Sequence, residues 1–214
     1  VVRAEMPASF ELEALKAQAI AARTYTYYKM ENGPSANHPD ADACDDITCC
    51  QAYKSEADAA VDWGMSTAVY ENKIRRAVAE TDGEVVLYAG APVLAVFHSS
   101  SAGATQNVED VWQSSLPYLQ SVDSPEGADA VPNYYSKVSF TLTDFKERFI
   151  AQYPTANLSG SPSNWFTNIQ QTETGAVLSL EVGGVSVSGT QLRTLLGLRS
   201  TTFTIDFTDT EVIF

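Results

Sequence analysis

The chain has 214 residues, of which 44% are hydrophobic and 10% aromatic, with 12 Gly and 9 Pro. This composition is that of a globular protein with a buried core, and it argues against collagen-like, coiled-coil and disordered classes. The formal net charge is −14, so nucleic acid is a poor partner, because binding to phosphate depends on Lys and Arg. No apolar run approaches the roughly 20 residues of a membrane span, and no signal segment begins at Val1. We therefore expect a trimmed chain without its targeting segment.

The clearest predicted helix covers residues 10–30. Leu12, Leu15 and Ala19 recur at helical spacing in a segment rich in Ala, Leu, Glu and Lys. Gly33 follows, as a C-capping glycine would. The next segment, 34–67, has no hydrophobic periodicity and holds the cysteines, so we expect a long loop that a ligand must order.

Short elements are predicted for the rest of the chain. Because helices and antiparallel hairpins alternate without a βαβ repeat, the predicted fold class is α+β. The segment 154–164 is rich in Ser, Pro and Asn and is the predicted linker between the parts 1–153 and 154–214. The predicted elements are a helix over 72–80, a hairpin of 84–88 with 92–99, a polar loop over 99–107, a helix within 141–153, a hairpin of 176–182 with 185–189, a helix over 190–196, and strands at 201–207 and 211–214.

A possible metal site lies in the loop, where His38, Cys44 and Cys50 offer one imidazole and two thiolates. This is a ligand set that zinc prefers, and it leaves a fourth position open. Two alternatives stay open, a vicinal Cys49–Cys50 disulfide and free thiols. Calcium is disfavoured, because the nearby aspartates lack the glycine and terminal glutamate of an EF-hand loop.

Glu5 stands just before the Met6-Pro7 turn that leads into the first helix. A carboxyl there can be a general acid, or simply a surface group that complements the helix dipole. Lys16 and Arg23 share one stripe of the helix, with Gln18 on another side, and charged helical residues usually form a solvated face.

The segment FHSSSAGATQ, residues 97–106, follows a predicted strand with small polar residues. Its hydroxyls could bind sugar hydroxyls or shape a cleft, and the candidate binding residues are His98, Ser99, Ser100 and Thr105. A Ser/His/Asp nucleophile is disfavoured, because adjacent residues on a strand point to opposite faces.

Four stretches together resemble the SpoIID (stage II sporulation protein D) family, which also includes amidase enhancers of bacterial walls. These stretches are EMPASFELEALKAQAIAARTY, CCQAY, RRAVAETDGEVVLYAGAPVLAVFHSSSAGATQNVEDVW with PYLQSV, and SGTQLRTLLGLRSTTFTI. The resemblance spans nearly the whole chain. Members of the family continue past LRSTTFTI into a GHGxGMSQ-like segment that this chain does not include, so its cleft could be incomplete.

The resemblance implies roles for particular residues. The glutamate of the EMP motif, here Glu5, is the catalytic acid of SpoIID-like enzymes, and the helix positions that match Lys16, Gln18 and Arg23 are associated with activity. Some members bind zinc through a His and two Cys, a pattern that falls here on His38, Cys44 and Cys50 and leaves Cys49 as the odd one out. We expect this zinc to be structural.

The resemblance also implies a lytic transglycosylase that cuts peptide-stripped peptidoglycan strands between N-acetylmuramic acid and N-acetylglucosamine. The expected site is a groove that the aromatic residues Tyr25, Trp112 and Tyr118 could line. A non-catalytic glycan-binding or amidase-enhancing module is the alternative, and a zinc-stapled scaffold is a weaker one. The implied location is extracytoplasmic, and a cell-wall amidase is an implied partner.

Overall fold

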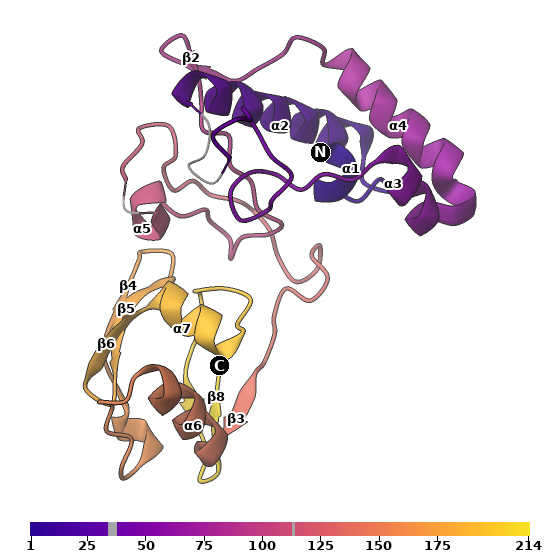
Figure 1. Ribbon diagram of the computed structural model, residues 1–214. Helices are drawn as coiled ribbons and strands as arrows, with labels where there is room; N and C mark the ends of the chain where they lie inside the picture. The colour runs from indigo at the N-terminus through magenta and orange to yellow at the C-terminus, as the bar shows by residue number, and fades with distance from the viewer. Residues whose placement is uncertain (34–37, 113) are drawn as a thin grey trace. The chain divides into compact units, whose positions relative to one another are not determined.

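The computed structural model describes residues 1–33, 38–112 and 114–214, which form two compact units, Val1–His98 and Ser99–Phe214. Helices are combined with small antiparallel sheets, which confirms the predicted α+β class (Figure 1). The division predicted at 153/154 falls inside the second unit, where residues on both sides of it share one hydrophobic core. No helix in the described part of the chain has the length and apolar character of a membrane span.

The first unit is mainly helical, and its long helix α2 packs against α4 (Figure 1). Small side chains such as Ala19 and Ala77 are buried between these helices together with Leu15 and Ile74, so the helices can approach closely. The elements of this unit are α1 (Val2–Glu5), α2 (Leu12–Asn32), α3 (Glu56–Trp63), the 3₁₀ helix η1 (Gly64–Ser66), α4 (Thr67–Glu80), β1 (Leu87–Tyr88) and β2 (Ala91–Pro92).

The predicted first helix is confirmed as α2, and Gly33 follows it with a φ of 86°, a conformation that favours glycine. The predicted loop is wrong in its second half, which contains α3 and η1. The side chain of Ser55 caps α3 by accepting a hydrogen bond from the Asp58 backbone N–H at 3.1 Å. Residues 34–37 of that loop lie outside the described residues.

The second unit is built around a core of aromatic and aliphatic side chains. Phe145 of α6 stacks on Trp165 with 5.9 Å between ring centroids, and both residues are fully buried. The elements of this unit are α5 (Val108–Trp112), β3 (Ser139–Thr141), α6 (Leu142–Gln152), the 3₁₀ helix η2 (Pro162–Asn164), β4 (Phe166–Gln171), β5 (Val177–Val182), β6 (Val185–Ser188), α7 (Gly189–Leu196), β7 (Asp206–Phe207) and β8 (Glu211–Ile213).

Both predicted hairpins are confirmed. β5 and β6 pair antiparallel around Gly183-Gly184, and they form a sheet with β4. β1 and β2 are shorter than predicted and pair around Ala89 and Gly90, both with positive φ. A second sheet has the order β3-β8-β7. α7 follows β6 (Figure 1) and begins with a capping box at Ser188.

Candidate functional site

Glu5 is the last residue of α1, and its half-buried side chain is held in place by the segment that follows the cysteines. Its Oε1 accepts a hydrogen bond from the backbone N–H of Ala52 at 2.6 Å. The chain leaves α1 in an extended conformation at Met6. A backbone donor that is itself fixed gives the carboxylate a defined orientation, as a catalytic acid requires.

Because four residues alone cannot form a stable helix, α1 depends on contacts with the rest of the first unit. An ion pair between Arg3 and Glu71 attaches it to α4. Arg3 Nε donates to Glu71 Oε2 at 2.8 Å, and Arg75 Nε lies 2.6 Å from Glu71 Oε1. The side chain of Glu71 is only 8% exposed. The hydrogen bond from Arg3 holds the pKa of Glu71 below its ordinary value.

We expect Glu71→Gln to lower the free energy of unfolding by about 1–2 kcal/mol, because it removes the negative charge from hydrogen bonds that the buried Glu71 accepts from the arginines Arg3 and Arg75. Since folding lowers the pKa of Glu71, its stabilisation is present above the ordinary carboxyl pKa of about 4.3 and is lost as the pH falls below it. Urea unfolding at pH 7 and at acidic pH measures both effects. The control Glu31→Gln makes the same change at an exposed position of α2 and should alter stability little. Equal stability of the two variants at pH 7 would contradict the expectation.

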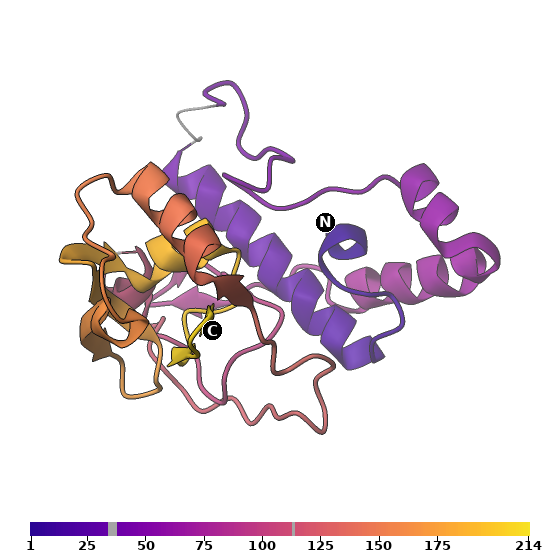
Figure 2. The ribbon, with the colours of Figure 1, turned by 90° about the horizontal axis from the view of Figure 1, so that it is seen from below.

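Residues 49–52 run back along α2 towards α1, as Figure 2 shows for the loop that leads to α3. The Tyr25 hydroxyl donates to the Cys49 carbonyl at 3.2 Å, and Gln51 Nε2 donates to the Ala22 carbonyl at 3.1 Å. The next residue, Ala52, reaches Glu5. The position of Glu5 therefore depends on the loop that carries the cysteines.

A group of three possible metal ligands lies in this loop. One ligand atom each from His38, Cys44 and Cys49 lies within 4.8 Å of the others, and the sulfurs of Cys44 and Cys49 are 2.7 Å apart. The predicted set had Cys50 in place of Cys49, and the sulfur of Cys50 lies 3.8 Å from that of Cys49. The three cysteines are free rather than disulfide-bonded.

This donor set fits a zinc ion. The Nε2 atom of His38 is buried and has no hydrogen-bond partner among the described residues, and a buried imidazole nitrogen is costly to leave unpaired. The hydrogen bond with Cys49 raises the pKa of the Cys44 thiol to about 12, so a zinc ion that binds there would have to displace the proton of this sulfur. Thiolate and imidazole donors are typical of zinc rather than calcium, and three of them leave room for a fourth ligand.

The predicted substrate-binding residues of α2 are engaged in contacts within the first unit. Lys16 Nζ lies 2.8 Å from Glu13 and 2.6 Å from Glu80, and the hydrogen bond to Glu13 raises the pKa of Lys16. Arg23 donates to the carbonyls of Thr81 at 2.7 Å and Glu84 at 2.9 Å, just after α4. These contacts join α2 to α4, while a role in substrate binding stays a prediction.

Gln18 differs from its two charged neighbours on α2. It is buried, and its Nε2 atom has no hydrogen-bond partner among the described residues. A buried amide donor without a partner costs free energy, so Gln18 retains a donor that a ligand could use.

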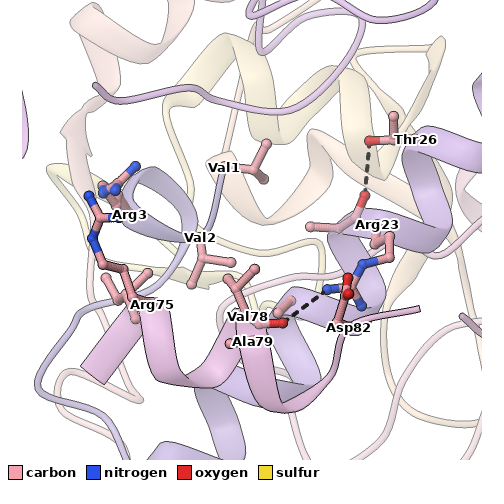
Figure 3. A pocket seen from close by; sticks show the side chains of 12 residues that line it. Val1, Val2, Arg3, Arg23, Thr26, Arg75, Val78, Ala79 and Asp82 are labelled. Carbon is pink, nitrogen blue, oxygen red and sulfur yellow. Dashed lines mark hydrogen bonds between the residues drawn. The ribbon is translucent and has the colours of Figure 1, made fainter. Parts of the chain in front are cut away.

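A pocket of about 650 Å³ opens between α1, α2 and α4, and Figure 3 shows its lining. Arg3, Arg23 and Arg75 contribute to its wall. Arg23 donates within it to the Val78 carbonyl at 3.4 Å (Figure 3), and Arg3 and Arg75 are bound to Glu71. Because all three guanidinium groups already hold hydrogen bonds or ion pairs within the first unit, an anionic ligand in the pocket would compete with these contacts.

The binding residues predicted in the segment 97–106 are divided between the two units. His98 is exposed and ends the first unit, and Ser99 is exposed and begins the second. Ser100 donates to Glu126 at 2.6 Å, and the Thr105 hydroxyl accepts from the Val122 N–H at 2.9 Å. The predicted groove that would join these residues to Glu5 stays a prediction.

The aromatic residues expected along that groove have different environments. The Tyr25 hydroxyl donates a hydrogen bond to the Cys49 carbonyl, and Trp112 in α5 is 55% exposed. Tyr118 is half-buried in the second unit. Their contact with a glycan stays a prediction.

Glu126, which the sequence did not single out, contacts one of the predicted binding residues, Ser100. It accepts hydrogen bonds from the hydroxyls of Ser100, Ser101 and Ser124 and from the Ser101 N–H. These donors, led by Ser100, lower its pKa to about 2. The contact of Glu126 with Ser101 spans 25 residues, so no local pattern could have revealed it.

Comparison with known proteins confirms the resemblance to the SpoIID family. Residues 1–88 match the model of the SpoIID family, described as stage II sporulation protein. This match contains Glu5, Ala52 and the three metal-ligand candidates.

Curated relatives extend the similarity to most of the chain. Stage II sporulation protein D of Bacillus subtilis (strain 168) is 36% identical over 203 residues, which are 95% of this chain and 57% of that protein. The protein of the same name from Bacillus amyloliquefaciens is 34% identical over the same shares. The amidase enhancer of Bacillus subtilis (strain 168) is 32% identical over 81% of this chain and 20% of that protein. The chain thus spans little more than half the length of the sporulation relatives.

Proposed function

We propose that this protein is a peptidoglycan lytic transglycosylase with Glu5 as its general acid and base. The observation that carries the proposal is the position of Glu5. It ends a helix that is anchored by an ion pair, its carboxylate is oriented by the Ala52 N–H at 2.6 Å, and it lies within the residues that match the SpoIID family. A carboxyl group fixed in this way can transfer a proton at a defined point of a bound glycan.

The proposed reaction cleaves the β-1,4 bond between N-acetylmuramic acid and N-acetylglucosamine. Protonated Glu5 donates its proton to the glycosidic oxygen as the bond from that oxygen to the muramic C1 breaks. The ionised carboxylate then accepts the proton of the muramic C6 hydroxyl, whose oxygen bonds to C1. The products are a 1,6-anhydro-muramic end and a free N-acetylglucosamine end, and Glu5 regains its proton.

Zinc is proposed as a structural ion held by His38, Cys44 and Cys49, with Cys50 close by. The ion would order the loop by ligation, since residues 38–55 contain no helix or strand. Through Gln51 and Ala52 that order would extend to Glu5. The proposed reaction uses no metal-bound water, so the ion would act through the fold.

The proposed substrate is a glycan strand from which stem peptides have been removed, which implies a cell-wall amidase acting beforehand. The proposed location is extracytoplasmic, because the substrate lies outside the cytoplasmic membrane. The net charge of −14 is consistent with a partner other than nucleic acid.

A second candidate is an amidase-enhancing or glycan-binding module without catalysis, which the similarity to an amidase enhancer favours. Glycan strands with and without stem peptides separate the two candidates when strand length is followed by size-exclusion chromatography. A transglycosylase shortens the peptide-free strands by itself. An enhancer leaves both unchanged, but accelerates peptide release when a cell-wall amidase is added to intact peptidoglycan.

A further inference from the structure

The carboxylate of Glu126 accepts hydrogen bonds from four donor groups of the serine cluster, which consists of Ser100, Ser101 and Ser124. The Ser100 hydroxyl lies 2.6 Å from Glu126, and the Ser101 and Ser124 hydroxyls each lie 2.9 Å from it. The Ser101 N–H is the fourth donor and lies 3.1 Å from both carboxylate oxygens. All four residues belong to the second unit, and all are half-buried.

This arrangement fixes the direction of three hydroxyl protons. An ionised carboxylate can only accept hydrogen bonds, and a serine hydroxyl has one proton but two lone pairs. Each serine in the cluster therefore donates its only hydroxyl proton to Glu126, and only its oxygen lone pairs remain for another partner. Ser100 also lies 3.4 Å from the Ser101 carbonyl, but the shorter bond to a charged oxygen is the stronger one.

We propose that Glu126 is a positioning residue that makes the serine cluster a hydrogen-bond acceptor for the O–H and N–H groups of a neutral sugar. This inference rests on the proposed function, because it takes the ligand to be a glycan. N-acetylglucosamine offers such donors in its hydroxyls and its acetamido N–H. A carboxylate or a phosphodiester offers only lone pairs at neutral pH, so the cluster would disfavour it.

The pKa of Glu126 supports the same assignment. Because the serine donors lower that pKa to about 2, the carboxylate is ionised throughout the neutral range. The hydroxyl protons therefore keep one orientation at physiological pH. Glutamine at this position would remove the constraint, because its amide donates as well as accepts and the serine protons could turn outward.

The test measures binding of N-acetylglucosamine oligosaccharides and of the same oligosaccharides with methylated hydroxyls, by calorimetric titration. All proteins carry Glu5→Gln, so that no turnover interferes. With Glu126 intact, we expect the unmodified sugar to bind about tenfold more tightly than the methylated one, the equivalent of one or two hydrogen bonds. With Glu126→Gln we expect this ratio to fall to about twofold or less, by the logic of a double-mutant cycle.

The control Glu109→Gln changes charge identically at an exposed position in α5 and should keep the tenfold ratio. If Glu126→Gln does not fold, Ser100→Ala removes one acceptor and should lower the ratio in part. An unchanged ratio in a folded Glu126→Gln or Ser100→Ala protein would overturn the inference, as would no binding of either sugar. Anhydro ends formed by the protein with intact Glu5 test the proposed function separately, so either idea can fail while the other stands.

Discussion

We expect Glu5→Gln to reduce formation of anhydro-muramic ends by roughly a thousandfold while the protein stays folded. Glutamine retains an oxygen that can accept the Ala52 N–H, so the local hydrogen bond at 2.6 Å can persist. It cannot, however, protonate a glycosidic oxygen or accept a proton from the C6 hydroxyl. Initial rates with peptide-free glycan strands, read by mass spectrometry, measure the loss, and thermal unfolding verifies the fold.

Glu11→Gln is the matched control for this change. Glu11 is exposed at the N-terminal end of α2, and its side chain makes no capping hydrogen bond. The same chemical change there should leave the rate within about twofold, because surface substitutions have small effects. If Glu5→Gln retains the rate of the control, Glu5 is not the acid, and another group must protonate the glycosidic oxygen.

The second large effect that we expect is a loss of zinc binding and of stability when a ligand in the group His38, Cys44 and Cys49 is replaced. His38→Ala or Cys44→Ser should abolish binding of one zinc equivalent, measured by elemental analysis after dialysis. We expect the midpoint of thermal unfolding to fall by at least about 5 °C, as a loss of about 2 kcal/mol predicts for a chain of this size. Activity should fall with it, because the loop no longer presents the Ala52 N–H to Glu5.

Two cysteine variants test which thiol completes the group. Cys49 lies in the group with His38 and Cys44, whereas Cys50 lies next to it. Cys49→Ser should therefore lose zinc and Cys50→Ser should retain it. The opposite pattern would restore the set predicted from the sequence, and zinc retained by every variant would contradict a site in this loop.

Elements with strong local signals were predictable from the sequence. α2 has helical periodicity and a terminal glycine, and the β5–β6 hairpin has alternating apolar residues around Gly183-Gly184. α3 was missed because its eight residues are too few to show periodicity beside a loop rich in polar residues. β4 was missed because most of its side chains are polar and exposed, and only pairing with β5 makes it a strand.

The candidate site was predictable only where neighbouring residues carry the chemistry. His38 and Cys44 were recognised from residue type and from the family resemblance. Neither distinguishes Cys49 from Cys50, since the path of the backbone decides which sulfur lies near the histidine. The contacts of Glu5 with Ala52 and of Ser101 with Glu126 join residues 47 and 25 positions apart. Contacts of that kind arise from tertiary packing and leave no pattern in a single sequence.

The central claim is tested most directly by the chemical nature of the ends that the protein leaves on peptide-free glycan strands. Mass spectrometry of the products distinguishes an anhydro-muramic end from a hydrolysed end, which is heavier by one water. We predict anhydro ends with the protein as it stands and none with Glu5→Gln. Hydrolysed ends, or uncleaved strands with a folded and zinc-loaded protein, would contradict the assignment of this chain as a lytic transglycosylase.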